Sequence, residues 1–526
     1  MNNKKTVTIF DSTLRDGAQA EGISFSVKDK IDILQTLDDF GVTYIEAGNP
    51  GSNPKDLEFF ETAKKIKLKN STLAAFGSTR RRSIKVEDDA NVQSLLKAET
   101  PAVVIFGKSW DFHVTEILKA TLDENLEMIK DTIEFFKKKG KEVIFDAEHF
   151  FDGYKNNAEY ALKSLQAAID GGADSLCLCE TNGGAYPDEV AEIVNRVVTT
   201  FPDSVIGIHT HNDGGMAVAN SVMAVVNGAT QVQGTFIGFG ERCGNANLST
   251  IIPNLEIKRG YKCLPEGNLQ NLTSVSRKIA SIANMQLYDF TPFVGNSAFA
   301  HKGGMHIDGV NKNSRTFEHI DPALVGNERR FLVSEVAGRS MILNTIQKID
   351  PSIDKNSPET KEIIDILKSM EHNGYQFEGA ESSFELVIHR HLKTYKPFFQ
   401  LEHFKIIGEE PSADKTACTS AIIKVKVDQT SEITAAEGDG PVNALDIALR
   451  KALDRFFPEL KNVKLTDYKV RVLDTKNATA AKVRVLIEST DGKEIWTTIG
   501  VSTDIIEASW KALVDSIEYK LLNNNS

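Results

Sequence analysis

The first half of the chain alternates short apolar segments with amphipathic helical patterns eight times, and this rhythm constrains the fold more than any other feature. Helical patterns such as KDKIDILQTLDDF and AEYALKSLQAAIDG separate the apolar segments. Near-continuous apolar strands that alternate with helices are typical of a parallel sheet covered on both faces. The eight strand candidates are TVTIFDS, VTYIEAG, STLAAFGS, AVVIFGKS, EVIFDAEHF, SLCLCETNG, VIGIHTHND and QVQGTFIGFG.

Eight such units within about 260 residues match the usual size of a (β/α)₈ barrel. A doubly wound open sheet is the alternative, but that fold seldom needs eight strands. In addition, no G-x-G-x-x-G motif follows the first strand of this chain. We therefore predict an α/β protein in which residues 1–270 form a TIM barrel.

The remainder of the chain has a different organisation. A chain of 526 residues is longer than a single hydrophobic core usually supports, so two or three domains are expected. Residues 271–399 are mostly helical in pattern and are interpreted as a helical linker region. Residues 400–526 contain a weak repeat at an offset of 60, in which AIIKVKVD from Ala421 recurs as AKVRVLIE from Ala481. Each copy combines alternating strands with a final helix, which predicts an α+β domain of two β-β-β-α repeats.

Charge and cysteine usage exclude several classes of protein. A net charge of −12 argues against a nucleic-acid or anionic-membrane partner, because both require a basic surface. No apolar run approaches the ~20 residues that span a bilayer, and the N-terminus has no apolar signal core. Five cysteines do not form a disulfide framework in a chain of this length. Cys177 and Cys179 are interpreted as fillers of a buried strand and Cys243 as structural, and a cytoplasmic location is expected.

A pair of histidines ends the seventh predicted strand. His209 and His211 are two residues apart, which places both imidazoles on one face of a strand. At the mouth of a barrel, where the catalytic groups of this fold lie, that face can bind a divalent cation. The pair alone does not exclude the alternative that both histidines pack in the core or form hydrogen bonds. His389 and His391 have the same spacing in helical sequence, where the rings diverge, and are discounted.

The first strand ends in DSTLRDG, which supplies an oxygen ligand. Asp16 with two imidazoles would make a two-histidine, one-carboxylate site with open positions for substrate. Asn245, in GFGERCGN after the eighth strand, is a further oxygen candidate. Oxygen-rich ligation without thiolate favours Mg²⁺ or Mn²⁺, with Zn²⁺ or Fe²⁺ as the alternatives. Arg15 would be an always-charged donor to a developing oxyanion, or else an ordinary ion-pair partner at the rim.

Other polar residues follow the third, fifth and sixth strands. Glu148 is a candidate base, or a group that orients one, and Thr181 with the glycines after it is a candidate carboxylate site. Arg80 opens the run STRRRS after the third strand. A solvated charge run is the default interpretation of that segment, and contact of Arg80 with an anionic phosphate tail such as that of CoA is the alternative.

The segments DSTLRDGAQAEG, HTHND and GFGERCGNANL together resemble the DRE-type metallolyase superfamily of TIM barrels. That family includes isopropylmalate, homocitrate and citramalate synthases and hydroxymethylglutaryl-CoA lyases. The C-terminal segments EGDGPVNALDIALRKAL and IGVSTDIIEASWKALVDSI are similar to the regulatory domain of the synthases. GNPGSNPKD, AFGSTRR and FDAEHFFDGYK are similar to the citramalate synthase branch. Ser12 and His149 depart from the motifs of the other two synthases.

The resemblance implies roles for individual residues. Asp16, His209, His211 and Asn245 would bind the metal. Arg15 and Thr181 would hold pyruvate, and Glu148 would be catalytic. His306 and Asp308 match a segment that reaches the neighbouring subunit's active site, which implies a homodimer; His301 in the same segment is assigned no role. The C-terminal domain would bind an amino-acid effector, isoleucine being the first candidate.

The activity that the resemblance implies is a metal-dependent condensation of acetyl-CoA with pyruvate. Condensing enzymes that use 3-methyl-2-oxobutanoate (isopropylmalate synthase) or 2-oxoglutarate (homocitrate synthase) are the nearest alternatives. A metal-dependent hydrolase on the same barrel is a remote alternative, and a non-catalytic amino-acid sensor is a further one.

Overall fold

A computed structural model describes residues 5–51, 53–332, 339–354, 356–377, 379–392, 395–408, 419–473, 481–492 and 494–524. The chain divides into two compact units, each described here by itself. The first comprises Met1–Phe299 with His319–Arg329, and the second comprises Ala300–Glu318 with Arg330–Ser526.

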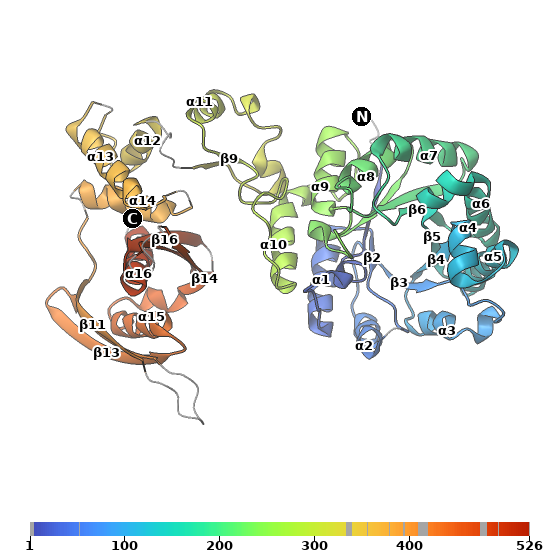
Figure 1. The fold of residues 1–526 in the computed structure, drawn as a ribbon, viewed down its shortest axis with the longest axis horizontal. Helices are drawn as coiled ribbons and strands as arrows, with labels where there is room; N and C mark the ends of the chain where they lie inside the picture. Colours follow the sequence, from blue (N-terminus) through green and yellow to red (C-terminus); the bar gives the residue numbers. More distant parts are fainter. Residues whose placement is uncertain are drawn as a thin grey trace. The chain divides into compact units, whose positions relative to one another are not determined.

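The first unit is a closed barrel of parallel strands in the order β1 to β8, which confirms the predicted TIM barrel (Figure 1). Strand β1 pairs with β8 and closes the barrel, with Asp11 opposite Gly234. The strands are β1 (Thr8–Asp11), β2 (Tyr44–Glu46), β3 (Thr72–Ser78), β4 (Ala102–Lys108), β5 (Glu142–Glu148), β6 (Ser175–Glu180), β7 (Val205–Thr210) and β8 (Gln231–Gly234).

Helices follow the barrel strands as the sequence pattern predicted. The first of them begins with a capping box between Ser26 and Asp29 and ends at Gly41. Gly41 has a φ of 93°, and a Cβ there would meet Pro265 Cδ at 2.4 Å, so only glycine fits. The helices are α1 (Val27–Phe40), α2 (Pro54–Ala63), α3 (Ala90–Lys97), α4 (Asp111–His113), α5 (Leu122–Lys138), α6 (Phe150–Gly171), α7 (Pro187–Thr200) and α8 (Ala217–Val226), with α9 (Leu248–Pro253) and α10 (Leu272–Ile282) after the barrel.

The barrel strands are apolar because both of their faces are buried. In β4 and β6, for example, nearly every side chain is inaccessible to solvent. Since all eight strands run parallel, their carboxyl ends meet at one rim, and the polar residues that end β1, β5, β6 and β7 are gathered there. The eighth strand is shorter than predicted, because a 3₁₀ turn with Ile237 at a φ of 62° takes the chain out of the sheet after Gly234.

The second unit begins with a short parallel pair, β9 (Ala300–His301) and β10 (Arg330–Phe331). Its helices are α11 (Gly304–Lys312), α12 (Arg339–Ile349), α13 (Pro358–His372) and α14 (Glu381–His391). Apolar side chains of α12 to α14 share a core with Ile499 and Val501 of the C-terminal region. The predicted division at residue 399 therefore crosses a shared core, and it stays a prediction.

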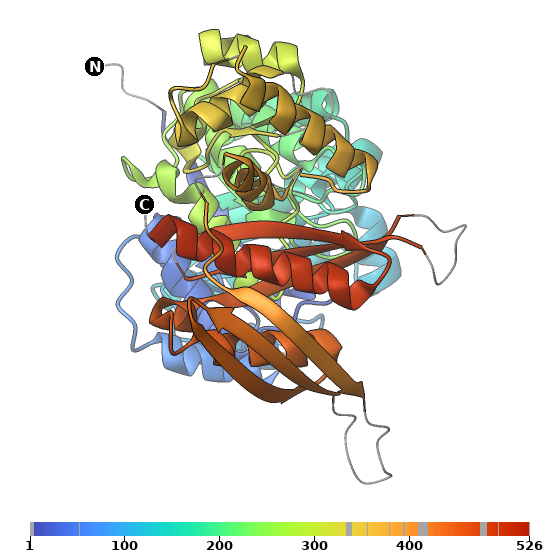
Figure 2. The ribbon, with the colours of Figure 1, turned by 90° about the vertical axis from the view of Figure 1, so that its left-hand side faces the viewer.

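The two predicted β-β-β-α repeats are present (Figure 2). The first consists of β11 (Gln400–Gly408), β12 (Thr419–Val427), β13 (Thr430–Gly438) and α15 (Pro441–Leu453). The second consists of β14 (Lys464–Val472), β15 (Val483–Thr490), β16 (Ile495–Ser502) and α16 (Ile505–Asn524). Each repeat forms its own antiparallel three-stranded sheet, and apolar side chains of each helix pack against the strands. Within the described ranges, no helix combines the length and apolarity needed to cross a bilayer.

Candidate metal centre and active site

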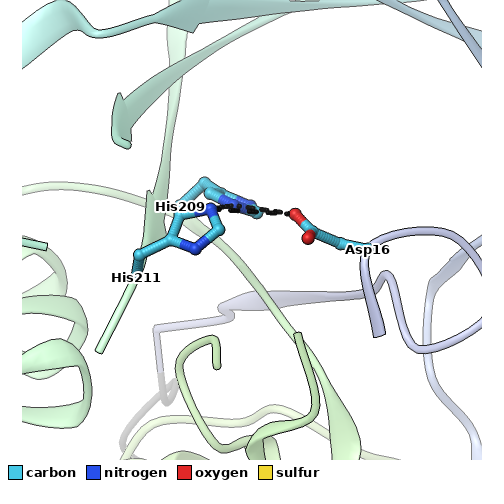
Figure 3. A group of neighbouring side chains, drawn as sticks. All are labelled: Asp16, His209 and His211. Carbon is cyan, nitrogen blue, oxygen red and sulfur yellow. Dashed lines mark hydrogen bonds and ion pairs between the residues drawn. The ribbon is translucent and has the colours of Figure 1, made fainter. Parts of the chain in front are cut away.

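Three side chains from two distant parts of the barrel sequence converge at the carboxyl-terminal rim. Asp16, His209 and His211 point toward one another in Figure 3, and all three are buried. His209 Nε2 lies 3.2 Å from His211 Nε2 and 3.4 Å from Asp16 Oδ2. His211 Nε2 lies 3.8 Å from the same carboxylate oxygen. The structure thus brings together the three predicted metal ligands.

The local backbone explains this convergence. His209 lies in β7, and His211 follows directly in an isolated bridge to Asn245. Between them, Thr210 faces away and binds Ala217 O and Ser221 Oγ through its hydroxyl. This alternation directs both imidazoles to the same side. Asp16 caps a 3₁₀ turn that follows β1, and its backbone N–H donates to Ser12 Oγ.

The spacing of the three donor atoms fits a divalent cation. Ligands bound at about 2.1 Å with angles of roughly 90–110° lie roughly 3.0–3.5 Å apart. Two of the three separations fall in this range and the third exceeds it slightly. Asn245 is buried, its Nδ2 donates to Phe239 O, and its Oδ1 has no hydrogen-bond partner among the described residues. An unpartnered buried oxygen next to His211 is consistent with the prediction of a fourth ligand, which stays a prediction.

The electrostatics of the three groups favour a bound positive charge. Burial opposes ionisation of Asp16, but Arg15 and the two histidines hold the pKa of its carboxyl well below the usual range. Burial also opposes a charge on His209, yet the hydrogen bond and charge of Asp16 raise its pKa above the ordinary value. Burial and the neighbouring His209 lower the pKa of His211 to about 3. The carboxylate and the neutral His211 ring are therefore already in the protonation states that a metal requires.

Arg15 is held beside the three residues by partners that the sequence did not reveal. Its Nε donates to Glu46 Oε2 at 2.6 Å, and its Nη1 lies 3.1 Å from Asp16 Oδ2. The guanidinium also stacks 3.9 Å from the ring centroid of Phe76. Ser12 Oγ donates to the same Glu46 oxygen. Glu46 at the end of β2 thus orients Arg15 toward the rim.

A cavity of about 230 Å³ opens directly above the three residues. Besides Arg15, Asp16 and the two histidines, it is lined by Glu148, Thr181, Phe76 and Phe106. Glu148 forms an ion pair with Lys108 at the end of the neighbouring strand. Thr181 Oγ1 accepts a hydrogen bond from the backbone N–H of His149, whose own conformation is left-handed with a φ of 55°. The structure therefore brings Glu148 and Thr181 to the same cavity as Asp16.

A second cavity of about 350 Å³ adjoins the first, and Arg15, Gln19 and Phe76 line both. It extends over the ends of β1 and β2, where Lys55, Asn49 and Asn53 provide polar groups and Ile23 and Phe25 an apolar wall. Together the two cavities offer adjoining spaces on either side of Arg15.

Other predicted residues lie elsewhere. The Arg80 guanidinium pairs with Asp131 of α5 at 2.9 Å and donates to the carbonyls of Arg81 and Ile84, and it lines neither cavity. His306 and Asp308 are exposed on α11 in the second unit. The His306 ring stacks on Phe317 at 4.0 Å, and Asp308 pairs with Lys312. The roles predicted for Arg80, His306 and Asp308 stay predictions.

The discounted histidines and the two cysteines of β6 match their expected settings, whereas Cys243 is exposed and its structural role stays a prediction. His389 and His391 lie on α14, where they are near Glu385 and Glu362 respectively. Cys177 and Cys179 are buried in β6, and their thiols lie close to Asp146. Burial raises the pKa of Cys177 well above the ordinary thiol value, so it is a neutral thiol, as expected of a strand filler.

Sequence reasoning missed four residues around the site: Glu46, Lys108, Asp146 and Gln233. Glu46 and Lys108 end β2 and β4, so the rule that selected the ends of the other strands would also have found them. Asp146 and Gln233 lie inside the barrel one layer below the rim and are buried. Burial and the neighbouring Glu46 raise the pKa of Asp146 to about 7. No pattern in the sequence distinguishes these interior polar residues from rim residues.

Family models match nearly the whole chain. The HMGL-like family matches residues 6–279, the homocitrate synthase post-HMGL domain-like family residues 293–374, and the LeuA allosteric (dimerisation) domain residues 378–521. The first match covers the barrel and the site described above.

Full-length relatives agree with these matches. The (R)-citramalate synthase of Aquifex aeolicus is 54% identical over 98% of both chains, and four further relatives of that name are 43–52% identical. The 2-isopropylmalate synthase of Pyrococcus furiosus is 30% identical over 98% of this chain and 99% of its own. A crystal structure of HMG-CoA lyase from Bacillus subtilis covers 55% of this chain and 97% of its own, with 24% identity and a TM-score of 0.47. The chain therefore belongs to the HMGL-like family, and it carries the LeuA allosteric (dimerisation) domain C-terminal to the family's barrel.

Proposed function

We propose that the protein condenses acetyl-CoA with pyruvate and hydrolyses the resulting thioester, giving citramalate and free CoA. The observation that carries this proposal is the convergence of Asp16, His209 and His211 beside Arg15 at the floor of a cavity. Relatives of 43–54% identity over nearly the whole chain, all named (R)-citramalate synthase, support the choice of reaction.

Asp16, His209 and His211 would hold the divalent cation, with Asn245 as a fourth ligand. The cation supplies Lewis acidity toward the ketone of the 2-oxo acid. Mg²⁺ or Mn²⁺ is our first expectation, because the carboxylate and amide ligands are oxygen donors, and Zn²⁺ is the second. The buried Asn245 Oδ1, which has no hydrogen-bond partner within the described ranges, supports this set of ligands.

Arg15 and Thr181 would position pyruvate. The Arg15 guanidinium, fixed by Glu46 and Phe76, can donate to the ketone oxygen, which becomes negative as the new bond forms. Thr181 Oγ1 accepts from the backbone of His149, so its hydroxyl hydrogen remains available to donate to the pyruvate carboxylate. Both side chains line the same cavity, which supports binding of one small molecule between them.

Glu148 would act as the base. Its carboxylate accepts a proton from the methyl group of acetyl-CoA, and the resulting carbanion forms a carbon–carbon bond to C2 of pyruvate. Water then cleaves the thioester, which releases the CoA thiol and leaves a free carboxylate. His306 and Asp308 of a neighbouring subunit would complete the site, and their exposure on α11 supports this role.

The two adjoining cavities suit the two substrates. We assign pyruvate to the cavity beside Asp16 and the CoA arm to the larger one over β1 and β2, whose polar groups include Lys55 and Asn49. Arg80 would contact a CoA phosphate only if it left its ion pair with Asp131. For this reason we rank Lys55 above Arg80 for that contact.

A stacked aromatic pair supports pyruvate over larger acceptors. The rings of Phe76 and Phe106 lie 5.1 Å apart at an interplanar angle of 16°, and both line the pyruvate cavity. These rings occupy space that a branched or extended 2-oxo acid would need. Condensation with 3-methyl-2-oxobutanoate, the reaction of a 2-isopropylmalate synthase, is the second candidate, favoured by the relative of that name.

We further propose that the enzyme is a homodimer inhibited by isoleucine through residues 400–526. The match to the LeuA allosteric (dimerisation) domain and the paired repeats support this regulation. Sedimentation of the full chain tests the dimer, and thiol release measured with each branched-chain amino acid tests the effector. The cytoplasmic location expected from cysteine usage stays a prediction.

The central experiment is thiol release from acetyl-CoA, measured with each 2-oxo acid in turn, with and without EDTA. We expect release with pyruvate, loss of release in EDTA, and recovery when Mg²⁺ or Mn²⁺ is added in excess. Mass spectrometry should identify citramalate as the product. Release with a larger acceptor in preference to pyruvate would reassign the substrate, and no thiol release with any acceptor would favour the hydrolase or the sensor.

A further inference from the structure

A chain of buried hydrogen bonds connects the interior of the barrel to one of the two rim histidines. Gln233 of β8 donates through Nε2 to Asp146 Oδ1 at 2.9 Å. On its other side, Gln233 Oε1 lies 3.1 Å from His209 Nδ1. Gln233 is fully buried and Asp146 nearly so. The three side chains therefore form one linear network below the rim.

The orientation of the Gln233 amide determines which nitrogen of His209 carries a proton. An amide nitrogen that donates to a carboxylate leaves the amide oxygen facing His209, and that oxygen can only accept. Nδ1 of His209 must then carry the hydrogen. In the neutral ring Nε2 is then the nitrogen without a hydrogen, and it faces Asp16 Oδ2, 3.4 Å away, and His211 Nε2, 3.2 Å away. This is the tautomer that a metal ligand requires.

The reverse orientation would have the opposite consequence. If the amide nitrogen of Gln233 donated to His209, Asp146 would have to donate a proton to the amide oxygen. The imidazole hydrogen of His209 would then lie on Nε2, facing Asp16, and the lone pair would point away from the other two ligands. Only the first arrangement directs three donor atoms at one point.

His211 provides an internal contrast. Its Nδ1 is buried and has no hydrogen-bond partner among the described side chains and backbone groups. The network through Gln233 therefore contacts His209 and not His211. Because both histidines are buried, the effect of this network can be distinguished from the effect of burial.

We propose that Gln233 is a positioning residue, which fixes His209 as the Nδ1–H tautomer and so prepares the centre of Asp16, His209 and His211 for a divalent cation. This inference rests on the proposed metal role of these three residues. It does not depend on which 2-oxo acid the enzyme uses, because the cation alone can test it.

The test compares two glutamines of the same strand. Gln231 lies two residues earlier in β8, so it projects from the same face, and it is equally buried. Its Oε1 has no hydrogen-bond partner in the described part of the chain. Gln233→Met and Gln231→Met therefore remove the same group from the same environment, but only the first removes the contact with His209.

Dissociation constants of Mn²⁺ and of Zn²⁺, measured by calorimetry on metal-free full-length protein, are the primary readout. We expect Gln233→Met to weaken binding about 10–100-fold, the usual effect of removing a partner of a metal-bound histidine. Gln231→Met should bind within about twofold of the unchanged protein, since it leaves the network intact. When Gln233→Met is assayed with pyruvate and acetyl-CoA at saturating metal, its kcat should fall by a smaller factor than its metal affinity.

A second variant and a spectroscopic signal separate positioning from general damage. Gln233→Glu keeps an oxygen that can accept from His209, so it should lose less metal affinity than Gln233→Met. In Zn²⁺-loaded protein labelled with ¹⁵N-histidine, a slowly exchanging Nδ1–H signal assigned to His209 should be present in the unchanged chain and absent in Gln233→Met. Equal affinities for Gln233→Met and Gln231→Met, or survival of that signal, would overturn the proposal. If thiol release failed with every 2-oxo acid while the affinity difference held, the proposed reaction would be wrong and the role of Gln233 would stand.

Discussion

Lys108 and Glu148 are direct partners in the register of β4 and β5, and their side chains form an ion pair at the carboxyl ends of these strands. The pair is largely shielded, with side-chain exposures of 15% and 25%. Glu148 reaches the cavity above Asp16, whereas the Lys108 ammonium lies 5.9 Å from the ring centroid of Phe106. The ammonium therefore holds the carboxylate at the edge of the cavity where a substrate proton would be removed.

This pairing leads to the first prediction. Glu148→Gln should lower kcat about 10²–10⁴-fold, the usual contribution of a general base, and leave the KM for pyruvate nearly unchanged. Lys108→Met should lower kcat less, because the carboxylate remains but is no longer held in place. Steady-state kinetics with both substrates provide the measurement. Glu116→Gln, an exposed control paired with Lys119, should behave like the unchanged enzyme, and full activity of Glu148→Gln would exclude its role as the base.

The second prediction concerns the three converging residues. Asp16→Ala or His209→Ala should lower kcat at least about 1000-fold, since several kcal/mol of charge stabilisation depend on the cation. Both variants should also bind Mn²⁺ more weakly in calorimetry. His389→Ala removes a histidine of α14 and serves as the matched control, with unchanged affinity. Normal turnover of either barrel variant in EDTA-treated buffer would contradict a metal role.

Selecting the polar residues at the ends of the predicted strands identified much of this site, because a parallel barrel brings the carboxyl ends of its strands to one rim. Asp16 and Thr181 follow β1 and β6, and Glu148 ends β5. The structure places these three around one cavity with His209 and His211. The period of two along β7 was enough to put both imidazoles on one side. The sequence pattern was therefore sufficient to predict which of these side chains lie at the rim and on which side of β7 the histidines project.

Partnerships across the barrel could not be predicted in the same way. Arg15 and Glu46 meet because β1 and β2 are neighbours in register, and nothing local to either residue indicates the other. The Arg80 guanidinium pairs with Asp131 of α5, so the run of arginines that suggested phosphate contacts begins with a buried arginine that already has a carboxylate partner. The Asp146–Gln233 contact joins β5 to β8 through the interior. Such contacts depend on strand order and layer, which composition and periodicity do not encode.

The third prediction concerns acceptor size. Phe106→Ala should widen the cavity beside Phe76 without touching the Arg15 guanidinium, which stacks on the other ring. We expect the ratio of kcat/KM for 3-methyl-2-oxobutanoate to that for pyruvate to rise about 10–100-fold, the range that one or two carbons are worth in an apolar pocket. Thiol release with each acid gives both constants, and the pyruvate value of the same variant is the internal control. An unchanged ratio would mean that another wall limits the acceptor.

The last prediction concerns pH and the second repeat. Glu518 of α16 is 1% exposed and accepts a hydrogen bond from the backbone N–H of Phe398, while its Oε2 has no hydrogen-bond partner among the described residues. Burial raises the pKa of Glu518 to about 7, against the lowering effect of Arg390. Because the unfolded chain ionises this carboxyl near pH 4.3, the folded state binds the proton more tightly. Stability should therefore fall as the pH rises from about 4 to 7 and level off above that range.

Glu518→Gln removes this titration and should stabilise the second unit at pH 8, by at most about 4 kcal/mol, with little effect at pH 4. Trp496 and Trp510 lie in the second repeat, so their fluorescence in a Trp110→Phe background reports thermal unfolding of this unit alone. Glu459→Gln, at a partly exposed position of the second unit, should reproduce the pH dependence of the unchanged chain. If Glu518→Gln and Glu459→Gln lost stability in parallel between pH 4 and pH 8, Glu518 would not be the group that titrates.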